Sequence, residues 1–323
     1  MNPADSQLVT LDDIRAAAER ILSIALRTPL LPLAGGAWLK VESLQPTGSF
    51  KIRGATNALS QLSPDQRAAG VVTHSSGNHA KAIARAARLL GIRAVVVMPN
   101  NAPAIKVAGV RADGGEIVFV GPANEERVAR AHRLADEQGF ALVPSADDAR
   151  IICGQGTVGT EIVEQLAAAG ADGPPTVLSP VGLGGLAAGV STAVKSLSPE
   201  ARVFGVEPAL AADTKASLEA GRRVAWPNED VGRTIADGLR GESPSPLPFL
   251  HLQRYLDGVL TVTEEEIAAA VRHAATALKL VLEPSGAVTL AALTNLPAQP
   301  GPVVAIATGG NIDPDRLIEL LRA

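Results

Sequence analysis

Aromatic side chains are scarce in this chain: they make up 2% of its 323 residues, although 46% of the residues are hydrophobic. The apolar content is therefore mostly Ala, Val, Leu and Ile, and an aliphatic core of this kind suits helices packed on strands. The length is ample for a large core and allows one large domain or two ordinary ones.

Three other absences exclude classes of protein. The single cysteine, Cys153, cannot form an internal disulfide, which is typical of a reducing compartment. No apolar run approaches a membrane span, and residues 1–13 carry acidic side chains and no long apolar run, so we expect neither a membrane segment nor a targeting peptide. A net charge of −4 leaves no basic footprint for nucleic acid. We therefore expect a cytoplasmic protein with neither a membrane nor a nucleic-acid partner.

Short runs rich in Val and Ile alternate with helical stretches along most of the chain. This order is typical of buried parallel strands joined by helical crossovers, and it predicts an α/β fold. The predicted strands are residues 71–73, 94–98, 117–120, 176–178, 202–206, 259–262 and 303–307.

Helix starts and joints are also marked. Capping boxes are predicted at Ser63 with Gln66, Thr263 with Glu266, and Thr10 with Asp13. The polar residues 139–150 look like a joint, and residues 226–248, with four prolines, are predicted to form a long ordered loop over a surface.

Lys51 lies between Phe50 and Ile52, after a Thr-Gly-Ser turn. Such flanks remove some hydration from the amine, and desolvation lowers the pKa of a lysine and makes it a usable nucleophile. On this segment alone, a surface lysine at a helix start is the slightly favoured alternative.

Three further turns follow predicted strands. Residues 73–80 (Thr-His-Ser-Ser-Gly-Asn-His-Ala) and 179–189 (Ser-Pro-Val-Gly-Leu-Gly-Gly-Leu-Ala-Ala-Gly) each lead into a helix, and residues 306–311 (Ile-Ala-Thr-Gly-Gly-Asn) end the last strand. Backbone N–H groups at a helix start bind anions, and ligands of open α/β sheets bind beyond the carboxyl ends of strands. A well-capped helix is the alternative for the first turn. The glycine spacing of the second fits neither the dinucleotide fingerprint nor a Walker loop.

Taken together, these segments resemble the fold-type-II enzymes that use pyridoxal 5′-phosphate (PLP), and within them the serine racemase and serine/threonine dehydratase family. The resemblance runs in order from about Thr28 to Asn311, and its most specific strings are Ser-Phe-Lys-Ile-Arg-Gly-Ala at 49–55 and Ser-Ser-Gly-Asn-His at 75–79. It implies a tryptophan synthase β-like α/β fold with two open, mostly parallel sheets flanked by helices and the cofactor in an interdomain cleft. Residues 1–69 and 147–323 would form the large PLP-binding domain and residues 70–146 the small substrate-binding domain.

The resemblance also implies roles around the cofactor. Lys51 would hold PLP as a Schiff base and act as acid and base, Phe50 would pack against the pyridine ring, Asn78 would bind the ring hydroxyl and Thr308 the ring nitrogen. Glu283 matches a position near the ring, with a solvated or structural Glu as the alternative. The amides expected to bind the phosphate are those of Gly182, Leu183, Gly184, Gly185 and Leu186.

The substrate is expected to meet the turn before the first of these helices. Its carboxylate would be bound by Ser75, Ser76, Gly77, Asn78 and His79. Ser76 matches the second base of racemases, and this residue permits racemisation without requiring it. Arg127 aligns with a position that reaches a distal carboxylate in some relatives; an arginine on a helix surface is the alternative.

A divalent-cation site is implied as well. Glu207, the Ala211 carbonyl and Asp213 would be its ligands, and all-oxygen ligation suits Mg²⁺, with Ca²⁺ or Mn²⁺ as alternatives. Two surface carboxylates after a strand are the other interpretation. The family further suggests a homodimer.

The predicted function is therefore PLP-dependent β-elimination of a small hydroxy-amino acid, L-threonine or L-serine, to a 2-oxo acid and ammonia. The alternatives are a serine or aspartate-type racemase, a 3-hydroxyaspartate dehydratase and, remotely, a PLP or amino-acid binding protein without turnover. Two departures from the family's pattern affect this prediction: Lys81 replaces a common Gln, and Val-Pro-Ser at 143–145 replaces a common His-Pro pair. The chain ends soon after Asn311, so we expect no regulatory domain of the biosynthetic dehydratase kind.

Overall fold

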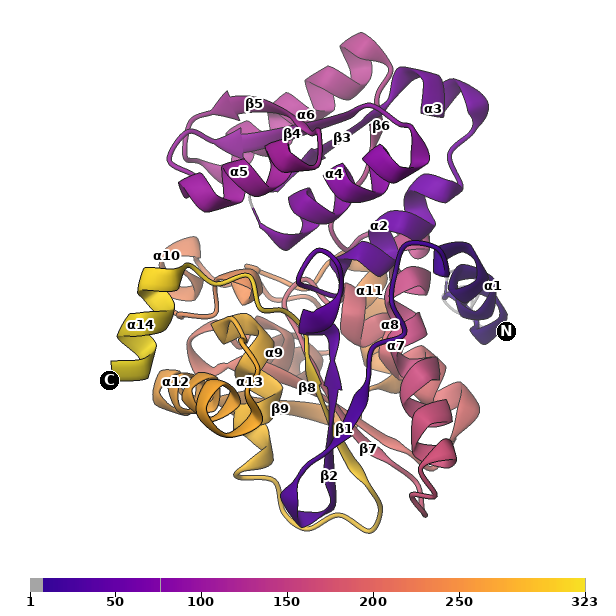
Figure 1. The fold of residues 1–323 in the computed structure, drawn as a ribbon, viewed down its shortest axis with the longest axis vertical. Helices are drawn as coiled ribbons and strands as arrows, with labels where there is room; N and C mark the ends of the chain where they lie inside the picture. The colour runs from indigo at the N-terminus through magenta and orange to yellow at the C-terminus, as the bar shows by residue number, and fades with distance from the viewer. Residues whose placement is uncertain (1–7, 76, 323) are drawn as a thin grey trace.

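The computed structural model describes residues 8–75 and 77–322, and it places two mostly parallel sheets one above the other (Figure 1). The upper sheet has the strand order β5-β4-β3-β6 and is parallel throughout. Its strands are β3 (Val71–His74), β4 (Ala94–Pro99), β5 (Glu116–Val120) and β6 (Ala141–Leu142).

The lower sheet has six strands in the order β1-β2-β10-β7-β8-β9, and only its edge pair, β1 with β2, is antiparallel. Its strands are β1 (Leu30–Pro32), β2 (Ala37–Val41), β7 (Thr176–Pro180), β8 (Arg202–Pro208), β9 (Gly258–Val262) and β10 (Val303–Ala307). This sheet therefore combines segments from both ends of the chain. The expected α/β fold with two mostly parallel sheets is confirmed.

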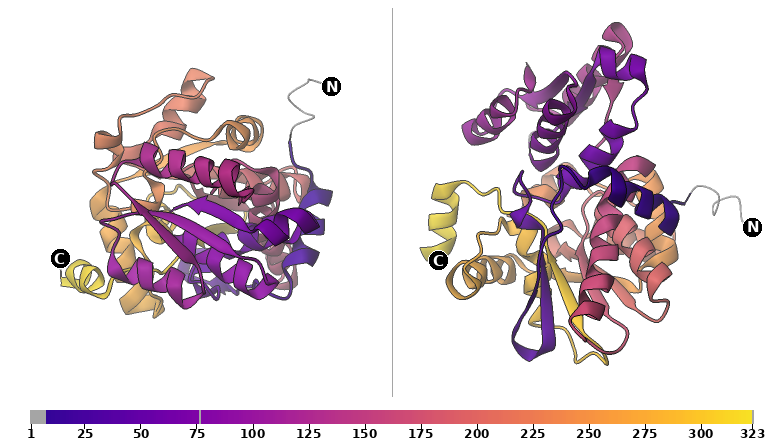
Figure 2. Two further views of the ribbon diagram at one scale, coloured as in Figure 1. Left: turned by 90° about the horizontal axis from the view of Figure 1, so that it is seen from above. Right: turned by 45° about the vertical axis from the view of Figure 1, so that its right-hand side comes forward.

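Helices cover both sheets, and α2 lies where the two parts meet (Figures 1 and 2). They are α1 (Leu11–Ile21), α2 (Lys51–Ser60), α3 (Pro64–Ala69), α4 (Asn78–Leu90), α5 (Ala104–Ala112), α6 (Asn124–Gln138), α7 (Ala149–Ala168), α8 (Gly185–Leu197), α9 (Asp213–Ala220), α10 (Asn228–Val231), α11 (Pro246–Tyr255), α12 (Glu264–His273), α13 (Pro284–Leu293) and α14 (Pro314–Arg322). Helices α7 and α8 pack closely because Gly189 has no side chain: a Cβ atom there would lie 2.3 Å from the Ile152 carbonyl oxygen.

The predicted strands all form, and the three capping boxes at Thr10, Ser63 and Thr263 are present with both reciprocal hydrogen bonds. The prediction for residues 226–248 is partly wrong. This segment contains α10, the 3₁₀ turn η5 (Asp237–Leu239) and the start of α11, where Pro246 occupies the first turn of the helix.

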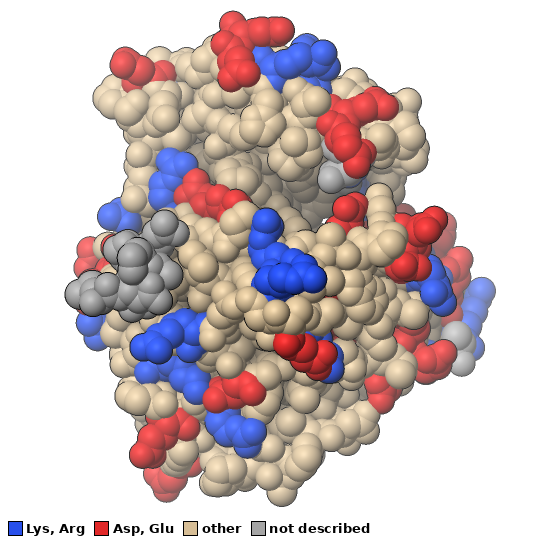
Figure 3. Space-filling model, turned by 180° about the vertical axis from the view of Figure 1, so that it is seen from behind, with Lys and Arg blue, Asp and Glu red and all other residues tan. Residues whose placement is uncertain are grey.

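The surface seen from behind is hollowed where the upper and lower parts meet, and acidic and basic side chains are interspersed on it (Figure 3). Within the described ranges, no helix combines the length and the apolar character needed to cross a membrane.

Candidate functional site around Lys51

Lys51 begins α2, directly after an isolated bridge that joins Ser49 to Gly309. Its Nζ atom donates a 2.9 Å hydrogen bond to the carbonyl of Ser145 and lies 5.0 Å from the centre of the Phe50 ring. Desolvation by burial lowers the pKa of Lys51 to about 8. The alternative of a surface lysine is therefore wrong, because the amine is partly buried and turned inward.

A cluster of buried charges fixes the helix that Lys51 begins. Arg53, 1% exposed, donates hydrogen bonds of 2.8 Å to Glu42 and of 2.7 and 2.9 Å to Glu161. Lys40 Nζ lies 2.5 Å from Glu161 as well, so the cluster joins β2, α2 and α7. We did not predict this role for Arg53, although the residue stands inside the Ser-Phe-Lys-Ile-Arg-Gly-Ala string.

The Gly-rich turn between β7 and α8 packs against Ala146, the residue that follows Ser145, and the Ser145 carbonyl binds the amine of Lys51. A Cβ atom at Gly185 would lie 3.1 Å from the Cα of Ala146, and one at Gly184, where φ is +92°, would lie 2.9 Å from Pro248. Within the described ranges, the amides of Gly182, Leu183 and Gly184 have no hydrogen-bond acceptor. Free amides before a helix N-terminus can bind an anion, and the binding of the phosphate by this turn stays a prediction.

The end of β10 borders the same place. Thr308 is buried, its carbonyl accepts from the amide of Phe50 at 3.1 Å, and its Oγ1 donates to the carbonyl of Ser285 at 3.4 Å. Glu283 is buried too, and its amide donates to the carbonyl of Gly309 at 3.1 Å. The alternative of a solvated Glu283 is therefore wrong.

Helix α4 faces this edge with its first turn. Asn78 Nδ2 donates to Glu283 Oε1 at 2.6 Å, and Asn311 Nδ2 donates to Asn78 Oδ1 at 2.7 Å. Burial raises the pKa of Glu283 to about 7, with the charge of Asp237 adding to the effect. Asn311 is a second residue that we did not assign to the site, and its position in the Thr-Gly-Gly-Asn turn was the available signal.

Two histidines flank the turn between β3 and α4: His74 ends β3, and His79 lies in the first turn of α4. His79 is buried, its Nε2 lies 3.2 Å from the carbonyl of Val143, and burial lowers its pKa to about 3, so the ring is neutral and donates from Nε2. Burial also lowers the pKa of His74, and the nearby charges of His132 and Arg127 lower it further. Arg127 on α6 is half-buried, and its role toward a substrate stays a prediction. Ser76 lies outside the described residues.

Two carboxylates lie near the end of β8: Glu207 is within the strand, and Asp213 begins α9. Glu207 accepts the amides of Thr214 and Lys215 at 3.0 Å each, whereas neither carboxylate oxygen of buried Asp213 has a partner in the described part of the chain. Burial raises the pKa of Glu207 to about 7 and, together with the charge of Glu207, raises that of Asp213 to about 8. Both carboxylates are buried, so the alternative of two surface carboxylates is wrong. Residues 8–75 and 77–322 contain no cluster of three or more His, Cys, Asp or Glu side chains suited to a metal.

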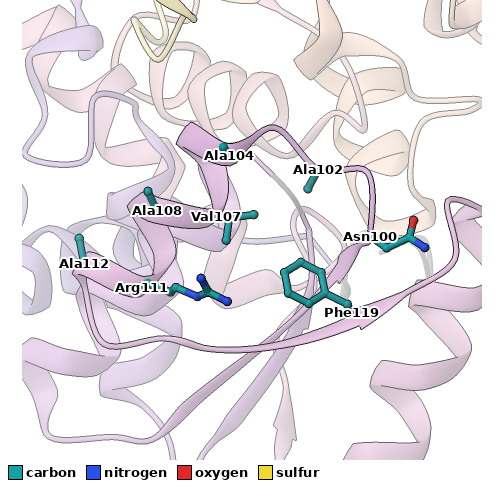
Figure 4. Close-up of a pocket in the computed structure, with 8 residues that line it drawn as sticks. All are labelled: Asn100, Ala102, Ala104, Val107, Ala108, Arg111, Ala112 and Phe119. Carbon is teal, nitrogen blue, oxygen red and sulfur yellow. The ribbon is translucent and has the colours of Figure 1, made fainter.

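A separate cavity of about 660 Å³ lies between α5 and β5, with Arg111 and Phe119 extended toward the same space (Figure 4). Its lining residues are Asn100, Ala102, Ala104, Val107, Ala108, Arg111, Ala112 and Phe119. None of the predicted site residues lines this cavity, so it is distinct from the site around Lys51.

The family model of the pyridoxal-phosphate dependent enzymes matches residues 21–309. The chain belongs to this family. The enzyme is 40% identical to an L-threo-3-hydroxyaspartate ammonia-lyase of Pseudomonas sp, over 98% of this chain and 99% of that protein. It also matches the crystal structure of a T.th. threonine deaminase, with 43% identity and a TM-score of 0.88 over 94% of this chain and 99% of the other. A maize serine racemase is 35% identical, with a TM-score of 0.90 over 97% of each chain.

The residues of this PLP enzyme fit the cofactor. The partly buried amine of Lys51, the free amides of the Gly182–Gly184 turn and the side chains of Asn78 and Thr308 lie at the carboxyl edges of the two sheets. An aldehyde, a phosphate and a ring with one hydroxyl and one nitrogen are the groups that such a set can bind.

Proposed function

We propose that this enzyme eliminates water from a hydroxy-amino acid, L-threonine or L-serine, and releases a 2-oxo acid and ammonia. The observation that carries the proposal is the amine of Lys51, which is desolvated and held at 2.9 Å by the Ser145 carbonyl, beside the first turn of α4. The relatives named as a threonine deaminase and a hydroxyaspartate ammonia-lyase support the reaction class.

PLP, when bound, supplies the electron sink for the pair left behind as the α-proton is removed. Lys51 Nζ is neutral in a larger fraction of molecules at neutral pH than an ordinary lysine, so this atom takes the α-proton. The turn at residues 75–79 binds the substrate carboxylate at the N-terminus of α4, and the amides of residues 182–186 bind the phosphate. The ring nitrogen would meet the hydroxyl of Thr308, and the ring hydroxyl would meet Asn78.

Asp213 and Glu207 are the proposed ligands of a divalent cation, together with the Ala211 carbonyl. Two unpartnered, buried carboxylate oxygens and an all-oxygen donor set fit a hard cation such as Mg²⁺, with Ca²⁺ and Mn²⁺ as alternatives. The cation would neutralise two carboxylates that burial otherwise disfavours in their charged form.

A 3-hydroxyaspartate substrate is the second candidate, because Arg127 lies close enough to His74 to lower its pKa. At this place the guanidinium would face the distal carboxylate of a dicarboxylic substrate. Ser76, as a base on the opposite face, would add racemisation.

A substrate panel on the PLP-loaded enzyme with Mg²⁺ tests these proposals. It follows 2-oxo acid release and the chirality of the remaining amino acid for L-threonine, L- and D-serine and the 3-hydroxyaspartates. Release from L-threonine or L-serine is expected, and it should be lost in Lys51→Ala. A preference for a 3-hydroxyaspartate that disappears in Arg127→Gln would select the second candidate. Accumulation of the D-isomer that disappears in Ser76→Ala would establish a racemase, and no turnover with any substrate would refute the eliminase.

A further inference from the structure

Four side chains form a single line of hydrogen bonds that crosses three times between α4 and the lower part of the molecule. Lys81 Nζ donates to Asn311 Oδ1 at 3.1 Å, Asn311 Nδ2 donates to Asn78 Oδ1 at 2.7 Å, and Asn78 Nδ2 donates to Glu283 Oε1 at 2.6 Å. Lys81 and Asn78 stand three positions apart on α4, so both side chains reach the same turn after β10.

The Lys81 end of this line determines the direction in which its hydrogen bonds are donated. A lysine ammonium only donates, and the Glu283 carboxyl keeps an oxygen that accepts whether or not it carries a proton. The two amides between them, Asn311 and Asn78, can each be inverted without a change of shape, because their oxygen and nitrogen ends are alike in size. With Lys81 at one end, Asn311 must present its oxygen to the lysine and its nitrogen to Asn78.

The surroundings of Asn311 hold this orientation. Its Nδ2 also donates to the carbonyl of Thr47 at 2.8 Å, so an inverted amide would set two oxygens against each other. Gly48, with φ at +75°, makes room for the amide, because a Cβ there would lie 2.5 Å from Asn311 Oδ1. The amide of Asn311 is thus fixed from three sides.

We propose that Asn311, locked by Lys81, is a positioning residue that fixes the amide of Asn78 with its nitrogen toward the cofactor ring. Because Asn311 occupies Asn78 Oδ1, the Nδ2 group of Asn78 gives one hydrogen to Glu283 and keeps the other for the ring hydroxyl. The inference rests on the proposed contact between Asn78 and that hydroxyl. The lock depends on Lys81, because a neutral amide such as Gln at this position could either donate or accept.

Asn311→Asp is the sharpest test because it keeps the shape and removes the donor. The new carboxylate cannot donate to Asn78 Oδ1, so Asn78 should invert and turn its oxygen toward the ring hydroxyl and toward the Glu283 carboxyl, which must then carry a proton to donate. We expect the Kd for PLP, measured by titration of the apoprotein, to rise about tenfold or more, and the absorption band of bound PLP to shift. Lys81→Met, which leaves the Thr47 contact intact, should raise the Kd less, by about threefold, while Lys81→Arg keeps the donor and the wild-type Kd.

Lys106→Met is the matched control for charge. It removes one positive charge from the same region, as Asn311→Asp adds a negative one, but Lys106 pairs with Asp237 at 2.8 Å and is not part of the line. Its Kd for PLP should stay within about twofold of the wild type. An equal loss of affinity in Lys106→Met and Asn311→Asp would overturn the inference, because the change in local charge alone would then explain the weaker PLP binding. An unchanged Kd in Asn311→Asp would also overturn it.

Two further variants keep the outcome interpretable. In Asn311→Asp combined with Glu283→Gln, the hydrogen bonds between positions 311, 78 and 283 can reform in the opposite direction. Thermal stability should then recover in part, because the contact with Thr47 stays lost, while the Kd for PLP stays high; recovery of the wild-type Kd would contradict the proposed direction. In Asn78→Ala, an unchanged Kd and spectrum would refute the contact between Asn78 and the ring. If Asn78→Ala weakens PLP binding and Asn311→Asp does not, only the positioning role of Asn311 fails.

Discussion

The amine of Lys51 and the carbonyl of Ser145 are joined by a 2.9 Å hydrogen bond. Ser145 lies in the short segment that leads from β6 in the upper sheet to α7, which packs beside α2 in the lower part. The carbonyl of Val143 in this segment also accepts hydrogen bonds from Thr73 Oγ1 at 2.8 Å and from His79. The segment that connects the two sheets therefore holds both the amine and the start of α4.

The desolvated amine of Lys51 predicts an unusual pH dependence for the uptake of PLP by the apoprotein. Only the neutral amine attacks an aldehyde, and its fraction rises about tenfold per pH unit below the pKa and levels off above it. With a pKa of about 8 in place of 10.5, the rate of covalent capture should rise up to about pH 8 and then level off. The rate of absorbance change on mixing with PLP, with borohydride trapping of Lys51, measures this. A rate that still rises tenfold per unit above pH 9 would contradict the lowered pKa.

We expect the substitution Gly184→Ala to weaken PLP binding, and a control variant can separate this effect from that of backbone strain. Gly184→Ala places a methyl group 2.9 Å from Pro248 in the proposed phosphate turn, at φ +92°. Gly170→Ala is the control, because its φ of +67° causes similar strain, roughly 1–2 kcal/mol, but nothing lies within 4 Å of the new methyl group. We expect the Kd for PLP, by absorbance titration, to rise at least about tenfold in Gly184→Ala and to stay within about twofold in Gly170→Ala. Equal values in the two variants would show that the turn does not bind the cofactor.

Most of the fold follows from local patterns, because buried parallel strands are short apolar runs and helix starts carry capping residues. β1, β2 and β6 escaped prediction for a physical reason. β6 has two residues, and the apolar positions of β2 are interrupted by Lys40, whose charge is compensated by Glu161 from a distant helix. Tertiary partners decide such positions, and a sequence shows them only when the partner is known. The domain limits at residues 70 and 146 remain a prediction.

The site was predictable as far as it is built from side chains at the ends of strands. Asn78 and Glu283 were both expected near the cofactor, and they meet at 2.6 Å. The contact with the Ser145 carbonyl was not predictable. Every residue has a backbone carbonyl, and only the folded path of the chain decides which one points toward Lys51. The donor and acceptor order of the hydrogen bonds from Lys81 to Glu283 was not predictable either, because it depends on which donors and acceptors become neighbours after folding.

The pair of buried carboxylates predicts that a divalent cation stabilises the protein more at high pH than at low pH. Without a cation, Glu207 and Asp213 have folded-state pKa values of about 7 and 8, above their ordinary 4.5 and 3.8. The folded chain then holds protons that the unfolded chain has released, so their contribution to stability is full below about pH 4 and falls as the pH rises through 7 and 8. A bound cation removes this loss.

Melting temperatures in EDTA and in millimolar Mg²⁺ or Ca²⁺ at pH 6 and pH 8.5 test this expectation. The rise caused by the cation should be larger at pH 8.5, and Asp213→Asn should abolish it at both. Ser217, which follows on the same helix and binds the Asp213 carbonyl with its hydroxyl, offers a control in Ser217→Ala, where the response to the cation should persist. A rise of equal size at both pH values, or one that persists in Asp213→Asn, would place the cation elsewhere.

The charge cluster around Arg53 predicts a large loss of stability when one partner is removed. Arg53→Met would leave Glu42, which is 0% exposed, without the guanidinium that now donates to both of its oxygens at 2.8 Å. An uncompensated charge in a buried pair costs about 3–5 kcal/mol, and we expect a loss of that size in the free energy of unfolding, measured by urea titration of the apoprotein. Arg93→Met is the matched control, because Arg93 forms an equally short 2.7 Å pair with Glu116 at the surface, where solvent screens the charges and the change should be small. If the two variants unfolded at the same urea concentration, the cluster would not be what holds α2, and Lys51 with it, against β2 and α7.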